Sequence, residues 1–342
     1  MPASLPMSMK TLVIKEPGGP LHLEERAMPQ LRKGEVLVQM TASPINPSDL
    51  ASLHGQYAVD WQFPFVPGME GSGRIVDHNA GRFAAQLMGK KVAAFAGREG
   101  LWAEYAAVPF ERVVPVGEKT RLDQAAMSLV NPLTAIALVS LAEKRGQTAI
   151  INTAAAGALG RMIRKRAVAR GLKVINTVRQ DAHIEALKAD GAVHVLNQNH
   201  PDFAEELKHL ARHYRANLAF DAIGGDFTLA LLKAMPKGGE VMIYGGLAMA
   251  PTSLTPEHFV FHDKKITGFW LVNWLDRRPL ALRLRDLYDV RRNLSGFALS
   301  KVAKVLTLDQ AENAAQIYQN NMSAGKVLIA PGGLNPEVSS QS

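Results

Sequence analysis

A run of small residues that follows a short apolar stretch carries the clearest chemical signal in the sequence. It comes directly after the apolar residues 148–152 and reads Ala154-Ala155-Ala156-Gly157-Ala158-Leu159-Gly160. Gly157 would let a backbone approach a pyrophosphate, and Gly160 would let a helix pack closely on its strand. The free N–H groups at the start of that helix would attract the phosphates. We therefore predict a dinucleotide site at Ala155, Gly157, Leu159 and Gly160, although a tight turn alone would also explain the small residues.

The residue after the second strand of such a site selects the cofactor. A carboxylate there binds the ribose 2′-hydroxyl of NAD, whereas an arginine suits the 2′-phosphate of NADP. Arg179 follows the apolar stretch 173–178, and the nearest acid, Asp181, lies in the turn beyond it. This order favours NADPH. The alternative is that Arg179 is an ordinary exposed residue.

A parallel sheet must position these residues, and the second half of the sequence predicts one. From about residue 125, short apolar stretches alternate with helical segments, of which three lie near 181–190, 201–214 and 226–235. The predicted strands are residues 148–152, 173–178, 192–197, 218–223, 240–245 and, as a sixth, about 265–271. Such alternation is typical of βαβ units, which form a parallel sheet with helices on both faces.

The chain before residue 125 has a different pattern. Apolar alternations broken by Pro and Gly predict strands at residues 35–43, 71–77, 90–96 and 101–108. A late strand at 326–330 is expected to return to this part of the chain. The predicted fold class is α/β, a β-rich domain beside a doubly wound parallel-sheet domain.

Composition sets limits on the function. The 342 residues suggest about two domains, and cysteine is absent, which excludes disulfides, thiolate nucleophiles, iron–sulfur clusters and cysteine-ligated zinc. We see no secretory signal and no membrane span; residues 125–142 are predicted to form a buried helix. We expect a cytoplasmic protein that binds neither membrane nor nucleic acid.

The net charge is 39 − 31, or +8. Basic residues gather in two stretches, 161–170 and 277–292. We interpret these mainly as solvated helix faces. The alternative is that they attract an anionic cofactor or an acidic acyl carrier.

With two further stretches, Asn46-Pro47-Ser48-Asp49 and Gly68-Met69-Glu70, the sequence resembles the medium-chain dehydrogenase/reductase superfamily. The resemblance covers residues 11–330. The resemblance implies a GroES-like catalytic domain from residues 1–125 and 270–342 and a Rossmann domain from 126–269. In the zinc alcohol dehydrogenases of that superfamily, a cysteine stands at the position of Asn46 and a histidine at that of Met69. Because both ligands are replaced, we predict no zinc.

Four short stretches make the resemblance to a particular family more specific; they are residues 45–49, 54–57, 131–135 and 268–271. They resemble the mitochondrial-type 2-enoyl thioester reductases, and quinone oxidoreductases are nearly as similar. The resemblance implies an enzyme that uses NADPH to reduce an activated C=C bond, most readily that of a 2-enoyl thioester. The alternatives are a quinone or enone reductase and, in another class, a cofactor-binding protein without turnover.

The resemblance also implies catalytic residues. Tyr57 matches the proposed proton donor, and a phenol with a pKa of about 10 holds a proton at pH 7 that it can deliver to carbon. Asn46 would orient Tyr57 or bind the thioester carbonyl. The structural alternatives are an aromatic wedge for Tyr57 and a turn-forming Asn-Pro for Asn46, while Asp49 suits a helix cap better than a base.

Thr134 would lie beside the nicotinamide, or else cap a helix. Gly245 and Gly246, after the fifth strand, would let the cofactor lie close to the backbone, or else form a turn.

Phe269 and Trp270, with Trp274, would line an acyl pocket, or else belong to the core or a subunit interface. The resemblance further implies a homodimer formed at the sixth strand.

Overall fold

The computed structural model describes residues 5–57 and 61–334. Contacts divide the chain into unit 1, residues 1–130 and 287–342, and unit 2, residues 131–286. The boundaries expected from the sequence were 125/126 and 269/270. Unit 2 thus both begins and ends later than expected, and within its last residues Arg278 Nη2 donates to Asp286 Oδ1 at 3.0 Å.

Unit 2 contains the parallel sheet. Its strands are β8 (Ala149–Asn152), β9 (Lys173–Val178), β10 (His194–Asn197), β11 (Leu218–Asp221), β12 (Glu240–Ile243) and β13 (Lys265–Gly268). They lie in the order β10-β9-β8-β11-β12-β13, and each neighbouring pair is parallel. The prediction of a doubly wound parallel sheet is confirmed, and β13 is an edge strand.

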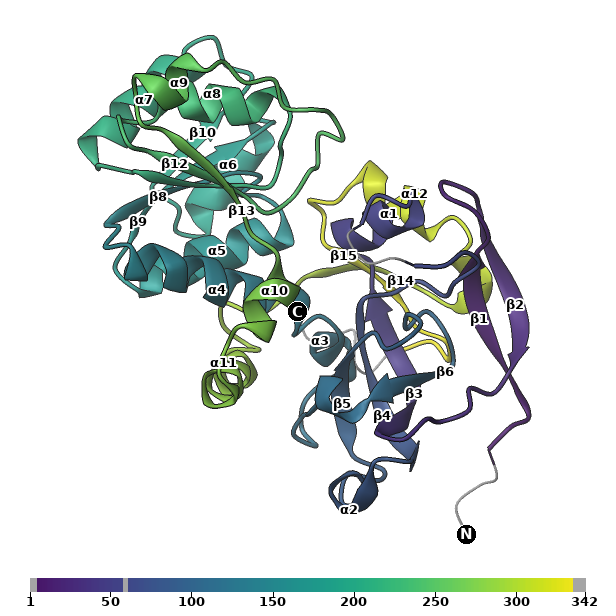
Figure 1. Ribbon diagram of the computed structural model, residues 1–342. Coiled ribbons are helices and arrows are strands. Elements are labelled where there is room, and N and C mark those ends of the chain that lie inside the picture. Colours follow the sequence, from purple (N-terminus) through teal and green to yellow (C-terminus); the bar gives the residue numbers. More distant parts are fainter. Residues whose placement is uncertain (1–4, 58–60, 335–342) are drawn as a thin grey trace. The chain divides into compact units, whose positions relative to one another are not determined.

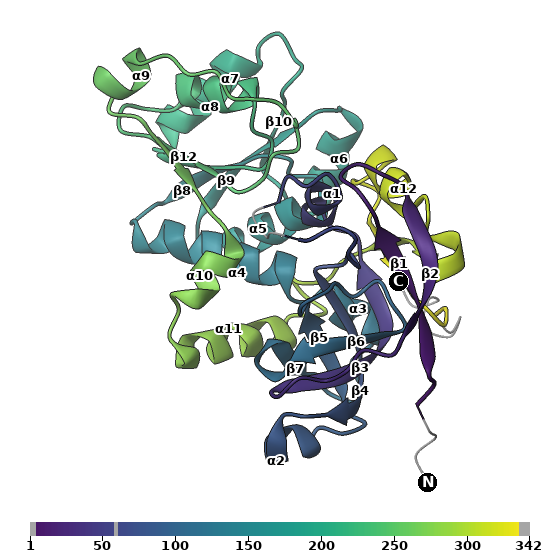
Figure 2. The same ribbon diagram turned by 45° about the vertical axis from the view of Figure 1, so that its right-hand side comes forward.

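Helices cover both faces of this sheet. They are α4 (Val130–Lys144), α5 (Ala158–Ala169), α6 (Ala182–Ala189), α7 (Phe203–His213), α8 (Asp226–Ala234), α9 (Glu257–Val260) and α10 (Leu271–Asp276). Figures 1 and 2 show α4 and α5 on one face and α7 and α8 on the other. Apolar residues of the strands and of α7 and α8, such as Ile151, Leu207 and Leu231, are buried between them.

Unit 1 is built mainly of strands. They are β1 (Ser8–Ile14), β2 (Leu21–Ala27), β3 (Glu35–Pro44), β4 (Glu70–His78), β5 (Lys91–Phe95), β6 (Tyr105–Pro109), β7 (Val113–Pro115), β14 (Val302–Leu306) and β15 (Lys326–Ile329). The larger sheet runs β14-β15-β3-β4-β5-β7, with β6 also pairing β3, whereas β1 and β2 pair with each other. The late strand therefore does return to the first part of the chain.

The helices of unit 1 are short: α1 (Pro47–Leu53), α2 (Gly81–Ala85), α3 (Leu122–Ala126) and α12 (Ala314–Asn320). A longer helix, α11 (Leu280–Arg292), crosses the boundary between the units. Sequence reasoning did not identify β1, β2, β14, α11 or α12 as elements. It also took residues 125–142 as one helix, where the structure has the end of α3 and then α4. No helix among the described residues is long and apolar enough to cross a membrane.

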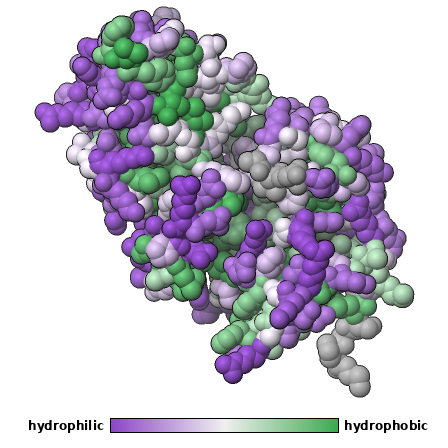
Figure 3. All heavy atoms as spheres, viewed as in Figure 1, coloured by the Kyte–Doolittle hydropathy of each residue, from purple (hydrophilic) through white to green (hydrophobic). Residues whose placement is uncertain are grey.

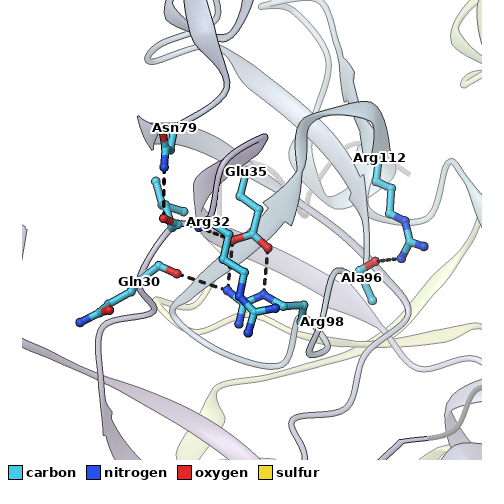
Figure 4. Close-up of polar contacts among 8 residues, drawn as sticks. Gln30, Arg32, Glu35, Asn79, Ala96, Arg98 and Arg112 are labelled. Carbon is cyan, nitrogen blue, oxygen red and sulfur yellow. Dashed lines mark hydrogen bonds and ion pairs between the residues drawn. The ribbon is translucent and has the colours of Figure 1, made fainter.

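A buried carboxylate fixes the start of β3 (Figure 4). Arg98 donates to Glu35 from Nε at 2.9 Å and from Nη2 at 3.1 Å, and the N–H of Arg32 donates at 2.8 Å. These hydrogen bonds, with that of Arg98 foremost, hold the pKa of Glu35 below its usual value. The loop before β3 and the loop after β5 are thereby joined at one carboxylate.

The turn from β8 to α5 is tightly packed around Gly160. A Cβ added at Gly160 would lie 2.6 Å from the carbonyl oxygen of Ala154 and 2.7 Å from Cα of Ala155. Asn152, at the end of β8, donates from Nδ2 to the Gly160 carbonyl at 3.0 Å and to Asn176 Oδ1 on β9 at 3.1 Å. The first turn of α5 is thus held against two adjacent strands.

We predict that Gly160→Ala lowers the free energy of unfolding by about 1–3 kcal/mol, because the added methyl group forces backbone atoms apart. Gly246→Ala is the matched control, since a Cβ there meets no atom within 4 Å. Urea denaturation of both variants measures the difference. Equal stability of the two would show that the turn is not as tightly packed as described.

Candidate active site

The helix that follows the glycine turn has an uncapped N-terminus. Gly157 is the N-cap residue of α5, and among the described residues no side chain caps that helix. Its first N–H groups therefore remain available to an anion, which the partial positive charge of the helix end would favour. Ala155 is buried and Leu159 half-buried in the first turn. The structure thus brings the four predicted loop residues together at one turn.

Two polar residues that sequence reasoning missed hold this turn beside β11. The hydroxyl of Thr153 accepts from the N–H of Ala222 at 2.8 Å. Asp221 accepts from Thr228 Oγ1 at 2.6 Å and from the N–H of Ile223 at 2.8 Å. The signal that was available is the position of each residue, at or just after the end of a predicted strand.

Arg179 lies where the sequence placed it, directly after β9, and its side chain is exposed. Asp181, the nearest acid that could bind a ribose 2′-hydroxyl, already makes a hydrogen bond, because its Oδ1 accepts from Asn197 Nδ2 at 2.8 Å. Asn199 Nδ2 donates to the Arg179 carbonyl at 2.9 Å and fixes the backbone there. A cationic side chain is therefore the group that this position offers.

The glycine pair after β12 has two different structural roles. A Cβ at Gly245 would lie 2.8 Å from the carbonyl oxygen of Ala222, so protein packing explains that glycine. A Cβ at Gly246 would meet nothing within 4 Å. The structure itself therefore leaves room for a ligand next to Gly246.

Three further predicted residues belong to unit 2. Thr134 is buried in the second turn of α4, so it is not the cap of that helix. Phe269 and Trp270 are half-buried between β13 and α10, and the N–H of Phe269 donates to the Ile243 carbonyl at 2.8 Å. Trp270 is the N-cap residue of α10.

In unit 1, Asn46 is the N-cap residue of α1 and is fully enclosed. Its amide donates from Nδ2 to Glu70 Oε1 at 3.0 Å, and its Oδ1 accepts from the ammonium group of Lys326. Lys326, which begins β15, also donates to the Ile45 carbonyl at 3.3 Å. Both ends of the amide are therefore held by charged groups.

Two buried carboxylates complete the Lys326 cluster, by which we mean Asn46, Asp49, Glu70 and Lys326. Asp49 accepts from the N–H of Asn46 at 2.7 Å, which confirms it as a helix cap, and from the N–H of Met69 at 2.8 Å. Glu70 Oε2 accepts at 3.0 Å from the N–H groups of both residues that lead into α4, 129 and 130. Each oxygen of both carboxylates has a donor.

Burial dominates the ionisation of this cluster. It raises the pKa of Asp49 to about 7 and raises that of Glu70, while it lowers the pKa of Lys326 to about 8. Burial also raises the pKa of Tyr318, whose ring centroid lies 5.6 Å from the Lys326 ammonium. Opposite charges within the cluster limit the pKa shifts of Asp49, Glu70 and Lys326, whereas the charge of Asp49 adds to that of Tyr318.

The donor set of the cluster does not suit zinc. The Asn46 oxygen faces an ammonium group, Met69 offers only a thioether, and the chain contains no cysteine. Within the described ranges, no three His, Asp or Glu side chains gather as a metal site would require. A second cation beside Lys326 would also be repelled.

Tyr57 follows α1 and is half-buried, three residues beyond its C-cap residue His54. It lies next to residues 58–60, which are outside the described part of the chain. Tyr57 and Asn46 belong to unit 1, whereas Thr134 and the glycine turn belong to unit 2.

Comparison with known proteins agrees with this division. Residues 32–118 match the model of the alcohol dehydrogenase GroES-like domain, and residues 158–286 match that of the zinc-binding dehydrogenase. Despite the name of the second family model, the residues of the Lys326 cluster lie outside the segment that it matches.

Relatives and solved structures cover most of the chain. A protein of Caenorhabditis elegans named enoyl-[acyl-carrier-protein] reductase, mitochondrial, is 33% identical over 281 residues, 78% of this chain and 79% of that protein. The crystal structure of a putative NADPH:quinone reductase from Mesorhizobium loti superposes with a TM-score of 0.87 at 32% identity, covering 96% of this chain and 100% of that chain. A quinone oxidoreductase from Thermus thermophilus, solved also as its NADPH complex, gives 0.76 at 26% identity, covering 94% and 100%. The chain belongs to the medium-chain dehydrogenase/reductase superfamily.

Proposed function

We propose that the protein is an NADPH-dependent reductase that transfers a hydride to the activated C=C bond of a 2-enoyl thioester. The observation that carries this proposal is the start of α5, whose N-cap residue Gly157 provides no side-chain cap and which is packed tightly at Gly160. Relatives of the chain are named enoyl reductases. The proposal includes independence from zinc. It also includes a homodimer formed through the edge strand β13, while the location in the cytoplasm stays a prediction from the sequence.

Residues of unit 2 would hold NADPH. The first N–H groups of α5 bind the pyrophosphate, and the exposed Arg179 binds the 2′-phosphate, because its neighbour Asp181 is already paired with Asn197. The open space at Gly246 leaves room for the cofactor beside the backbone. NADPH, when bound, supplies the hydride.

The substrate must be polarised before it binds, because the Lys326 cluster offers no place for a Lewis acid. A double bond conjugated to a thioester carbonyl meets this requirement. Hydride addition at Cβ moves an electron pair toward the thioester oxygen, and proton delivery to Cα completes the saturated product. The protein must therefore supply hydrogen-bond donors and one proton.

We assign the proton to Tyr57. A phenol with its ordinary pKa of about 10 keeps its proton at neutral pH and can deliver it to Cα. Asn46 acts as a positioning residue, because its amide is committed to Glu70 and Lys326. Phe269 and Trp270 would contribute apolar surface to the acyl pocket.

A second candidate function is reduction of quinones. It is favoured by the likeness to the putative NADPH:quinone reductase, which extends over 96% of this chain at 32% identity. A quinone is likewise polarised without a metal, so the same residues would serve both reactions.

We predict that the protein oxidises NADPH in the presence of crotonyl-CoA and of a longer 2-enoyl-CoA, and that it does so faster than with a benzoquinone. Absorbance at the wavelength of the reduced nicotinamide measures all three rates. Turnover of the quinone alone would replace the first function with the second. Tight NADPH binding without turnover of any of the three would leave a cofactor-binding protein.

We predict that Tyr57→Phe lowers kcat for enoyl reduction by about 100-fold, because a general acid contributes at least that much. The Kd for NADPH should not change, since Tyr57 does not contribute to the cofactor turn. Tyr105→Phe is the matched control, as it removes another half-buried phenol of unit 1, which accepts from Gln39 at 3.4 Å. A Tyr57→Phe enzyme with the original kcat would end the proposed role.

We predict that Arg179→Ala raises KM for NADPH by about 10- to 100-fold and leaves KM for NADH almost unchanged, because only NADPH carries the 2′-phosphate. Lys188→Ala, on the neighbouring helix α6, removes one exposed cation of the same unit and serves as control. An equal effect of Arg179→Ala on both cofactors would refute the contact.

A further inference from the structure

A cavity of unit 2 lies at the edge of the parallel sheet opposite the glycine turn. It has a volume of about 230 Å³ and adjoins the residues where β9 and β10 begin and α5 ends. We call it the β9 cavity; the lining residues that carry the argument are Arg164, Val168, Lys173, Val193, His194 and Tyr214. Arg179 follows the other end of β9, and a strand of six residues separates its two ends by roughly 17 Å. The cavity is therefore distinct from the predicted dinucleotide site.

Two valines at this cavity are open to water. Val168 on α5 is 53% exposed and Val193, just before β10, is 78% exposed, whereas Leu172 and Val174, which also line the cavity, are buried. Scattered apolar residues are ordinary on a surface, and Figure 3 shows hydrophobic and hydrophilic residues intermixed on the face that it presents. These two valines differ because they border a cavity with further apolar lining, so the apolar part of a ligand would cover them.

Arg164 brings a buried cation to the same cavity. It is 3% exposed, and its Nη2 donates to Asp190. Its Nε is a buried donor without a hydrogen-bond partner in the described part of the chain. Buried donors are nearly always paired in folded proteins, so an unused donor points to an acceptor that binds there. The cavity thus offers a guanidinium that can bind a further anion.

The charges around Arg164 are not balanced. Arg161 Nη1 and Lys165 Nζ also approach Asp190, at 3.7 Å and 3.1 Å, so three cations share one carboxylate. Burial, foremost, lowers the pKa of Arg164; the charge of Asp190 opposes this shift and that of Arg161 adds to it. A second anion near Arg164 would therefore stabilise its charged form.

Lys173 adds another positive charge at the cavity. It is the first residue of β9 and is exposed. His194 and Tyr214 form a hydrogen bond of 2.9 Å between the ring Nε2 and the hydroxyl oxygen. Burial, together with the charges of Lys173 and His213, lowers the pKa of His194, which favours the neutral ring. This pair therefore supplies polar surface without charge, and the cations of the cavity are Lys173 and Arg164.

We propose that the β9 cavity binds a small organic anion, a carboxylate carried by an apolar chain or ring. The carboxylate pairs with Arg164 and Lys173, and the apolar part covers Val168 and Val193. A volume below the roughly 300–1,000 Å³ of drug-sized sites limits this apolar part to about six carbons. Because the cavity and the dinucleotide turn lie at opposite edges of the sheet, both can be occupied together. The inference is independent of the reaction that the enzyme catalyses.

Isothermal titration calorimetry of the full chain with hexanoate tests the proposal. We expect saturable binding with a Kd of about 1 mM or below, as suits a ligand of this size. Hexanol, which lacks the charge, and inorganic phosphate, which lacks the apolar chain, should each bind at least about tenfold more weakly. In methyl NMR spectra, hexanoate should shift the signals of Leu172 and Val193.

Two variants change the cavity at exposed residues, where substitution is expected to leave the fold intact. Lys173→Glu reverses a charge, and Val168→Glu places a carboxylate beside the ligand; each should raise the Kd for hexanoate by about tenfold. Lys237→Glu and Val260→Glu are the matched controls, because they make the same changes at exposed positions of unit 2 that do not line the cavity. Both controls should keep the Kd within about twofold of the wild type.

Several results would overturn the proposal. They are the absence of saturable hexanoate binding below about 10 mM, equally tight binding of hexanol or of phosphate, and an equal effect of all four variants. Competition by NADPH, or weaker binding by Arg179→Ala, would also overturn it, because hexanoate would then occupy the dinucleotide site. None of these measurements uses the reductase assays, so failure of the proposed function leaves the test of the cavity unchanged.

Discussion

Unit 1 depends on the buried ammonium group of Lys326, whose charge compensates two buried carboxylates. Two carboxylates, Asp49 on α1 and Glu70 on β4, are removed from water, and each would be costly there without a cation and hydrogen-bond donors. Lys326 supplies the cation from β15, close to the end of the described chain, and its contact with Asn46 spans 280 positions of sequence. Because β15 also pairs with β3, the same strand closes the sheet and compensates the charge. The N-terminal and C-terminal segments of unit 1 are therefore one structure electrostatically as well as topologically.

This arrangement connects the replaced metal ligands with the chemistry. At the two positions where zinc-dependent members of the superfamily hold Cys and His, this chain has an amide and a thioether, and the amide is used to join Lys326 to Glu70. Glu70 in turn accepts from the two N–H groups that lead into α4. The amide thus connects the Lys326 ammonium to the carboxylate that holds the start of α4.

Features set by neighbouring residues were predicted correctly from the sequence, whereas contacts between residues far apart in the sequence were not. The Gly160 turn and the strand before it were predicted, because a glycine that cannot tolerate a Cβ and an apolar run are both visible within a few residues. Lys326 was recognised only as part of a strand, since nothing near it in sequence shows that its ammonium would lie against Asn46. Thr134 beside Pro132 suggested a cap, but α4 begins at Val130, and Glu70 supplies the acceptor from a distant strand. The roles of Tyr57 and Arg179 remain predictions.

The two basic stretches show that a run of charged residues in the sequence does not by itself predict a charged surface. In the first stretch, Arg161, Arg164 and Lys165 converge on the single carboxylate of Asp190, and Arg164 is buried there, contrary to a wholly solvated face. In the second stretch, Asp286 is buried with Arg278, whereas Arg285, Arg291 and Arg292 are exposed. A run of basic residues therefore converges on one carboxylate in the first stretch and leaves several exposed arginines in the second. The carboxylate of the first contact, Asp190, follows a different helix, α6, whereas Asp286 lies on α11 itself, and the net charge of +8 distinguishes neither arrangement.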